Sequence, residues 1–311
     1  MDPSSTESLM AMIAVGLCVP LIQACATRLG SLIKEAGEPV TGPVRPTRPH
    51  RRTTSTVGGM RIIVLGGCGA WPAAGQACSG YLIEHDDFSL LIDPGYATLP
   101  RLLRFTPAEA VDAVLVSHGH PDHCADLNPL LRARVLRADR PPPLPVYTLP
   151  GALDQVLALD EPEMMRPGIE IREFGAGDAF TVGPFGVTSW PLPHFVPNAG
   201  LRLTAGGQSL AYTGDSGPSP DLVTLARDAD LFLAEATYVD EVPAKHAGHL
   251  SCADQVGRDA AEARARRLML THLWPGTPPD AAVAAAARHY DGEIIVARSA
   301  LIIDLGDNRD E

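Results

Sequence analysis

The segment that most constrains this chain is Ser117–His123, which reads SHGHPDH. It places three histidines and one aspartate within six residues, directly after an apolar run at 113–116. Neutral imidazole and carboxylate groups both suit zinc. Alternate residues of an extended segment point to one side, so His118 and His120 can approach one ion, while the following Asp122-His123 pair turns toward a second. A lone histidine is usually a core or surface residue, but this spacing predicts a metal centre.

Short apolar segments alternate with helical patterns on both sides of this motif. We expect strands at 61–66, 81–85, 88–95, 113–120, 145–149, 169–174, 180–192, 201–215, 230–238, 269–273, 293–297 and 300–305. We expect helices at 97–106, 127–138, 151–159, 219–227, 251–265 and 279–289. Strands followed by strand–helix alternation in each half favour two sheets packed face to face with helices outside. The predicted fold class is therefore α/β, an αββα four-layer sandwich.

The first 59 residues differ in composition from the rest. Residues 41–59 hold three prolines, four arginines and no acidic residue, which is typical of a flexible linker. An apolar run at 9–26 is interrupted by Pro20 and preceded by no basic residue, unlike an export signal or a membrane span. We expect residues 1–59 to form a poorly ordered extension and 60–311 the catalytic domain. A signal or anchor at about 9–26 is the alternative to a cytoplasmic protein.

The net charge bears on the kind of substrate, and the cysteines bear on the redox state of the protein. A formal net charge of −12, from 37 acidic and 25 basic residues, gives no general attraction to a nucleic-acid backbone. The six cysteines form no CxxC pair and are typical of reduced cytosolic thiols, with a Cys68–Cys78 disulfide as the less favoured alternative. We expect no firm membrane association. A homodimer is possible from the sequence.

Three further residues complete a pattern that resembles a known family. After HxHxDH come Pro193-His194, Gly214-Asp215-Ser216 and Thr271-His272, each near the end of an expected strand. This order is similar to the ligand series of metallo-β-lactamase-fold hydrolases, and the resemblance covers about residues 60–305. It implies the same four-layer fold.

The resemblance also implies how the ligands divide between two ions. One metal would take His118, His120 and His194, and the other Asp122, His123 and His272, with Asp215 bridging them. The ions would hold a shared hydroxide as the nucleophile, and Asp122 would orient it or accept its proton. Zinc is the expected metal, with manganese or iron as alternatives. A turn aspartate in TGDSG is the simpler interpretation of Asp215, but its position between His194 and His272 favours the bridge.

Two later segments resemble motifs of one branch of this family. Ala234-Glu235-Ala236-Thr237 and Gly248-His249-Leu250-Ser251 are similar to the HEAT-type and HST-type motifs of ribonuclease Z and PhnP-like phosphodiesterases. Ala234 stands where His is usual, and Leu250 where Ser is usual. The resemblance implies catalytic roles for Glu235 and His249, with Glu235 holding one ring nitrogen of His249. A strand-end carboxylate and a capping turn are the simpler alternatives.

These observations predict a hydrolase that cleaves small phosphodiesters such as cyclic nucleotides. Ribonuclease Z usually carries a long tRNA-binding arm between the positions of His194 and Asp215, but here these two are only 21 residues apart. Nucleic acid is therefore a less favoured substrate, and a tRNA 3′-end endoribonuclease is the first alternative. Zinc β-lactamases commonly have Cys at the position of Asp215. Lactonases and thioesterases share the bridging Asp and form the second alternative.

Overall fold

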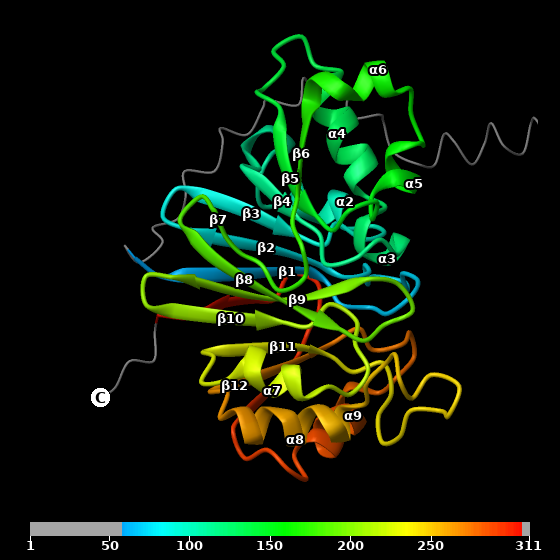
Figure 1. The fold of residues 1–311 in the computed structure, drawn as a ribbon, viewed down its shortest axis with the longest axis vertical. Helices are drawn as coiled ribbons and strands as arrows, with labels where there is room; N and C mark the ends of the chain where they lie inside the picture. Colours follow the sequence, from blue (N-terminus) through cyan, green and yellow to red (C-terminus); the bar gives the residue numbers. More distant parts are fainter. Residues whose placement is uncertain (1–57, 307–311) are drawn as a thin grey trace, which may run out of the picture. The chain divides into compact units, whose positions relative to one another are not determined.

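The structure is a computed structural model, and it describes residues 58–306. The expected extension at 1–59, with the candidate signal at 9–26, lies outside the described residues apart from Gly58 and Gly59. Figure 1 shows the described part as two sheets stacked on each other, with helices on the outer face of each. This is the predicted four-layer arrangement.

The first sheet contains the strands of the N-terminal half and the last strand of the chain. Its order is β14-β1-β2-β3-β4-β5-β6. The strands are β14 (Ile302–Asp304), β1 (Met60–Gly66), β2 (Gly80–His85), β3 (Phe88–Ile92), β4 (Ala113–Leu115), β5 (Leu144–Thr148) and β6 (Ile169–Glu173). Pairing is antiparallel from β14 to β3 and parallel from β3 to β6.

The second sheet has the order β13-β12-β11-β10-β9-β8-β7. Its strands are β7 (Ala179–Val182), β8 (Phe185–Leu192), β9 (Asn198–Ala205), β10 (Gln208–Tyr212), β11 (Leu231–Glu235), β12 (Arg267–Thr271) and β13 (Glu293–Val296). Pairing is antiparallel from β7 to β10 and parallel from β10 to β13.

The helices lie on the two outer faces (Figure 1). Above the first sheet are α2 (Leu99–Leu102), α3 (Pro121–Cys124), α4 (Leu127–Val135), α5 (Asp154–Leu157) and α6 (Pro162–Met165). Below the second sheet are α7 (Pro220–Ala226), α8 (Ala253–Ala263) and α9 (Pro279–Ala286). Short 3-10 turns occur at Ala108–Ala110 and Arg166–Gly168.

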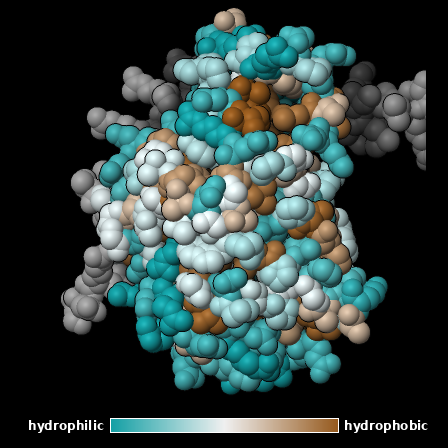
Figure 2. All heavy atoms as spheres, in the orientation of Figure 1, coloured by the Kyte–Doolittle hydropathy of each residue, from teal (hydrophilic) through white to brown (hydrophobic). Residues whose placement is uncertain are grey.

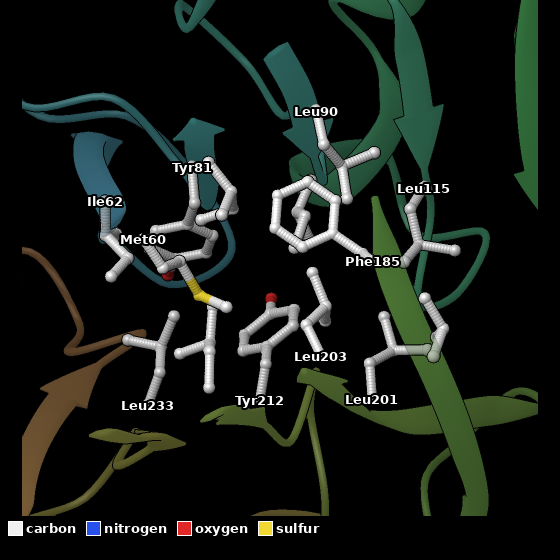
Figure 3. Packing of buried hydrophobic residues seen from close by; sticks show 14 of the residues in the cluster. Met60, Ile62, Tyr81, Leu90, Leu115, Phe185, Leu201, Leu203, Tyr212 and Leu233 are labelled. Atoms are coloured by element: carbon white, nitrogen blue, oxygen red, sulfur yellow. The ribbon is translucent and has the colours of Figure 1, made fainter. Parts of the chain in front are cut away.

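Three hydrophobic cores separate the four layers. The central core lies between the sheets, where Met60, Ile62 and Tyr81 face Leu203 and Tyr212 (Figure 3). The two outer cores pack each sheet against its helices. Strand β1 is apolar from Ile62 to Leu65 because its alternate residues enter the central core and the outer core.

The structure differs from the expected elements mainly in their ends. The helices expected at 97–106 and 151–159 shorten to α2 and α5, which have four residues each. The segment 180–192 divides into β7 and β8 because Gly183, at φ +55°, makes the turn between them. Helix α3 forms inside the motif itself, where Pro121 starts a turn that the strand pattern did not predict.

The described part contains four free cysteines and no helix that could cross a membrane. Cys68, Cys78, Cys124 and Cys252 are free and buried, so the alternative Cys68–Cys78 disulfide is not formed. Within residues 58–306, no helix has the length and apolar character needed to cross a bilayer. Figure 2 shows hydrophilic residues over much of one face, with hydrophobic residues in separate groups.

Candidate metal centre

The candidate ligands meet because each follows the end of a strand. The SHGHPDH motif follows β4, His194 follows β8, Asp215 follows β10 and His272 follows β12. An isolated bridge between His118 and Asn198 joins the first sheet to the second at this point. All seven predicted ligands lie in one cluster, and together they form two overlapping groups.

The first group contains His118, His120, His194 and Asp215, whose ligand atoms lie within 4.8 Å of one another. His120 Nδ1 lies 3.2 Å from His118 Nε2 and 3.0 Å from His194 Nε2. Asp215 Oδ2 is 3.9 Å from His118 Nε2 and 3.8 Å from His194 Nε2. Four donor atoms therefore surround one position.

The second group contains Asp122, His123, His272 and again Asp215. His272 Nε2 lies 3.1 Å from Asp122 Oδ2 and 3.2 Å from Asp215 Oδ2. His123 Nε2 lies 3.2 Å from Asp215 Oδ1 and 3.6 Å from Asp122 Oδ2. All four side chains are buried, and Asp215 is the residue that belongs to both groups.

In four of the candidate histidines, Nδ1 has a hydrogen-bond partner outside the cluster. Ser117 Oγ lies 3.0 Å from His118 Nδ1, and the carbonyl oxygen of His249 lies 2.8 Å from His194 Nδ1. Partners of this kind fix the tautomer and the orientation of a ligand ring. Asp93 Oδ2 holds His123 Nδ1 at 2.8 Å, and Thr237 Oγ1 lies 2.8 Å from His272 Nδ1. Each Nε2 is therefore directed toward the cluster.

Asp93 is the functional residue that the sequence did not identify. It is fully buried after β3, and it accepts hydrogen bonds from the backbone N–H and hydroxyl of Ser117 and from the hydroxyl of Tyr212. Its bond to His123 makes it the anchor of the whole motif. The only signal was a strand ending in an aspartate at Asp93-Pro94-Gly95, which is equally typical of a turn.

Burial and neighbouring charges set the protonation of the cluster. Burial lowers the pKa of His118 well below its usual value and that of His194 to about 4, so both rings are neutral at neutral pH, as a metal ligand must be. Burial opposes ionisation of Asp215, but His272 and His123 outweigh it and hold its pKa well below the usual range. The carboxylates in turn raise the pKa of His123 against the effect of its burial. The carboxylates therefore favour a positive charge between Asp215 and His123.

The donor set fits a pair of divalent cations. Among the described residues, the buried His123 Nε2 and Asp215 Oδ1 have no hydrogen-bond partner, although they lie 3.2 Å apart. Leaving such atoms unpaired costs free energy unless another group satisfies them. Imidazole nitrogens with carboxylate oxygens are the ligands that zinc takes. A cation between these atoms would satisfy both.

The backbone around the cluster is closely packed. His272 has a φ of +60°, a left-handed conformation that is uncommon outside glycine and concentrated at functional sites. Gly95 has no room for a side chain, because a Cβ there would lie 1.8 Å from the carbonyl oxygen of Asp122. This close contact with Gly95 helps to hold the backbone of the SHGHPDH motif in place.

Glu235 lies at the end of β11 and is buried. Its carboxylate accepts hydrogen bonds from the backbone N–H groups of Ser216, Thr237 and Ser251 at 2.9–3.2 Å. The expected contact with the ring of His249 is not formed, because these three N–H groups surround both oxygens. Burial raises the pKa of Glu235 to about 7. Glu235 thus ties together the loops that follow Asp215 and precede α8.

His249 lies beside the first group. Its carbonyl oxygen holds His194, and its ring lies 4.5 Å from the ring of Phe195. Its Nδ1 is buried with no hydrogen-bond partner in the described part of the chain. The neighbouring His246 is half-buried, and its Nδ1 lies 2.7 Å from the hydroxyl of Tyr238. Nδ1 of His249 is therefore uncommitted among the described residues, whereas Nδ1 of His246 is bonded to Tyr238.

The fold and the cluster define a class of metal-dependent hydrolase, and comparison with known proteins gives the family. Residues 89–273 match the Beta-lactamase superfamily domain, so the chain belongs to this superfamily. It is 34% identical over 246 residues to the probable metallo-hydrolase YhfI of Bacillus subtilis, covering 78% of this chain and 99% of that protein. The crystal structure of YhfI superimposes with a TM-score of 0.73 at 33% identity, over 79% of this chain and 99% of that one.

Two further comparisons fall in the expected branch. Ribonuclease Z of Haloferax volcanii is 27% identical over 295 residues, covering 76% of this chain and 92% of that protein. The crystal structure of a diphosphatase from the PhnP family has a TM-score of 0.60 at 19% identity, over 78% of this chain and 97% of that one. The second likeness is one of fold.

Proposed function

We propose that this protein is a dinuclear metal-dependent phosphodiesterase that cleaves small phosphodiesters such as cyclic nucleotides. The observation that carries this proposal is the pair of donor groups sharing Asp215, with the backbone carbonyl of His249 bonded to His194 and Nδ1 of His249 unpartnered among the described residues. We assign one ion to His118, His120 and His194, and the other to Asp122, His123 and His272, with Asp215 contributing to both. The donor set favours zinc over manganese or iron. The catalytic domain in this proposal is 60–311.

Divalent ions held at these two positions would supply Lewis acidity toward phosphoryl oxygens and would lower the pKa of water. The protein's own contribution begins with Asp122. Its Oδ2 accepts a hydrogen bond from the N–H of Ala70 at 2.8 Å, which fixes the carboxylate beside His272. In that position Asp122 can orient an attacking water and accept its proton.

His249 and Glu235 would act on the other side of the reaction. Cleavage of a phosphodiester leaves an alkoxide, which needs a proton or a positive donor. The ring of His249 is the candidate donor, because its Nδ1 has no hydrogen-bond partner among residues 58–306 and its backbone carbonyl lies on His194. Glu235 is a positioning residue in this scheme: it holds the N–H of Ser251, two residues after His249, and that of Ser216, which follows Asp215.

Small substrates are preferred in this proposal for two reasons. Strands β9 and β10 are joined at Gly206-Gly207, so the interval between His194 and Asp215 is a compact hairpin without an inserted arm. The net charge of −12 also disfavours a long polyanion. The similarity to ribonuclease Z keeps pre-tRNA as the first alternative substrate, and lactones or thioesters are the second.

The first test is hydrolysis of a substrate panel by the metal-loaded protein. The panel contains bis-p-nitrophenyl phosphate, 2′,3′- and 3′,5′-cyclic nucleotides, pre-tRNA, and acyl lactones and thioesters. We expect turnover of the cyclic nucleotides. Turnover of lactones or thioesters without any phosphodiesterase activity would reject the proposal, and turnover of pre-tRNA alone would replace it with the endoribonuclease.

The second test is the substitution His249→Ala. If the ring protonates the leaving oxygen, cleavage of a nucleotide phosphodiester should slow by about 10²–10⁴-fold, the usual contribution of a general acid. The loss should be much smaller for a p-nitrophenolate leaving group, which needs no proton. His289→Ala, which removes a histidine that bonds to Asp254 instead, is the matched control. An equal loss on both substrates would assign His249 to phosphate binding.

A further inference from the structure

A continuous row of aromatic rings borders the metal cluster. Ring centroids are separated by 5.7 Å between Trp71 and Trp274, 5.3 Å between Trp274 and Tyr238, 6.2 Å between Tyr238 and His246, and 5.7 Å between His246 and Phe195. We call these five residues the aromatic rim. They come from four separate loops, so their contact is made only in the folded chain.

One end of the rim is joined to the second ligand group. Trp71 follows Ala70, whose N–H donates a hydrogen bond to Asp122 at 2.8 Å. Trp274 lies two residues after His272. The indole pair is therefore positioned by the same short segments that position the two candidate ligands.

The other rings are connected to the cluster just as closely. Tyr238 follows Thr237, whose hydroxyl lies 2.8 Å from His272 Nδ1. Phe195 follows His194, and the two rings lie 5.2 Å apart. A group held by the cluster therefore has aromatic neighbours on the loops of both ligand groups.

Two rings of the aromatic rim are half-exposed. Trp71 is 48% exposed and Phe195 is 50% exposed, although large aromatic side chains gain most from burial. Trp274 is tilted by 52° against Trp71 and by 47° against Tyr238, so neither pair is stacked face to face. Trp71, at the end of the rim, therefore keeps about half of its surface exposed beside a site proposed for phosphodiesters, whereas Phe195 also contacts the ring of His249.

We propose that the aromatic rim binds the nucleobase of a nucleotide phosphodiester by stacking, and that Trp71 is its principal residue; this rests on the proposed function. A flat base can stack on a half-exposed ring such as that of Trp71, and base–aromatic stacking is tolerant of which base is present. A flexible acyl chain gains more from an enclosed apolar pocket than from open faces. The rim therefore favours substrates that carry a base over other small phosphodiesters.

The first experiment compares two substrates that differ only in the base. One is a 2′,3′-cyclic nucleotide, and the other is the 2′,3′-cyclic phosphate of 1-O-methylribose, which has the same phosphodiester and leaving group. We expect Trp71→Leu, which keeps apolar volume but removes the flat ring, to lower the ratio of the two kcat/KM values by about 10–100-fold. Trp71→Phe should retain most of the ratio. Leu136→Ala, at an exposed position on the surface, should not change it.

The second experiment separates binding from turnover. Affinities of AMP and ribose 5-phosphate for the metal-loaded protein are measured by calorimetry and by quenching of tryptophan fluorescence. We expect AMP to bind at least about 10-fold more tightly to the wild type, and Trp71→Leu to remove that difference. Equal affinities in the wild type, or an equal loss of both substrates in Trp71→Leu, would overturn the stacking role. A wild type that prefers AMP but cleaves no phosphodiester would instead reject the proposed function.

Discussion

The two sheets of this protein share one plan but contribute differently to the site. Each runs through three antiparallel pairs and then three parallel pairs. Strands β3 and β10 hold the same place in their sheets, and each is followed by a buried aspartate. Asp215 after β10 faces both donor groups, whereas Asp93 after β3 holds the motif from behind. Equivalent positions have therefore taken different roles.

The larger contrast concerns how the ligands are distributed. The first sheet supplies His118, His120, Asp122 and His123 from one segment of six residues, and Asp93 bonds to that segment at both Ser117 and His123. The second sheet supplies its ligands one at a time, from the ends of β8, β10 and β12. A single substitution should therefore disturb several ligands in the first half but only one in the second, with Asp215 as the exception.

The largest effect should come from Asp215→Ala. This substitution removes the one carboxylate that both groups share. We therefore expect weaker binding of both ions and a fall in activity of roughly 10³-fold or more. His118→Ala removes a ligand from the first group alone, and it should lose one ion of two along with nearly all activity. Elemental analysis of the purified proteins measures both. Wild-type stoichiometry near zero with hydrolysis intact would remove metal from the proposal altogether.

A smaller effect separates the two kinds of anchor. Asp93→Asn keeps the shape of the side chain but weakens four hydrogen bonds, from Ser117, His123 and Tyr212. Thr237→Val removes the single hydroxyl beside His272. Loss of an outer partner typically costs 10–100-fold in metal affinity or activity. We expect Asp93→Asn at the upper end and Thr237→Val at the lower end, measured by competition with a chelator. Equal losses of metal affinity in the two variants would show that carrying several ligands on one segment does not make the first half more sensitive to substitution.

The same contrast explains how much could be predicted from the sequence. The motif around His118 could be recognised because its ligands are contiguous, and its spacing alone indicated metal. His194, Asp215 and His272 are single residues, and only their order, matched to a family, identified them. The fold was predictable because strands buried on both faces contain continuous apolar runs, such as Ile62–Leu65 of β1.

Asp93 and the partners of Glu235 could not be predicted for a physical reason. Their roles depend on contacts between segments far apart in the chain, such as Tyr212 with Asp93 and Ser251 with Glu235. Nothing in the local pattern of Asp93-Pro94-Gly95 distinguishes an anchor from a turn. The contact between Trp71 and Trp274 is of the same kind, because about two hundred residues separate them.

The two helix layers also differ in how well a buried charged residue is hydrogen-bonded. On α4, the buried Arg134 donates hydrogen bonds to the carbonyl oxygens of Ala108, Val111 and Pro142. On α8, the buried Asp259 accepts one bond from Gln255 through Oδ1, and its Oδ2 has no partner among the described residues. One buried charge ties three segments together, whereas the other is poorly satisfied. Asp259 is therefore the position where the second half should be easiest to stabilise.

The smallest effect should be a gain in stability from Asp259→Asn. Burial raises the pKa of Asp259 to about 6, above its value in the unfolded chain. The folded state then binds more protons than the unfolded state between about pH 4 and pH 6, so ionisation of Asp259 lowers stability as the pH rises through that window. The amide carries no such penalty. The free energy of unfolding of Asp259→Asn should exceed that of wild type by about 1–2 kcal/mol at pH 8, with the gain shrinking toward pH 4. Denaturant unfolding at pH 5 and pH 8 measures this, with Glu241→Gln, at an exposed carboxylate that does not act on Asp259, as the control. A gain that does not change with pH would mean that the carboxylate is not the cause.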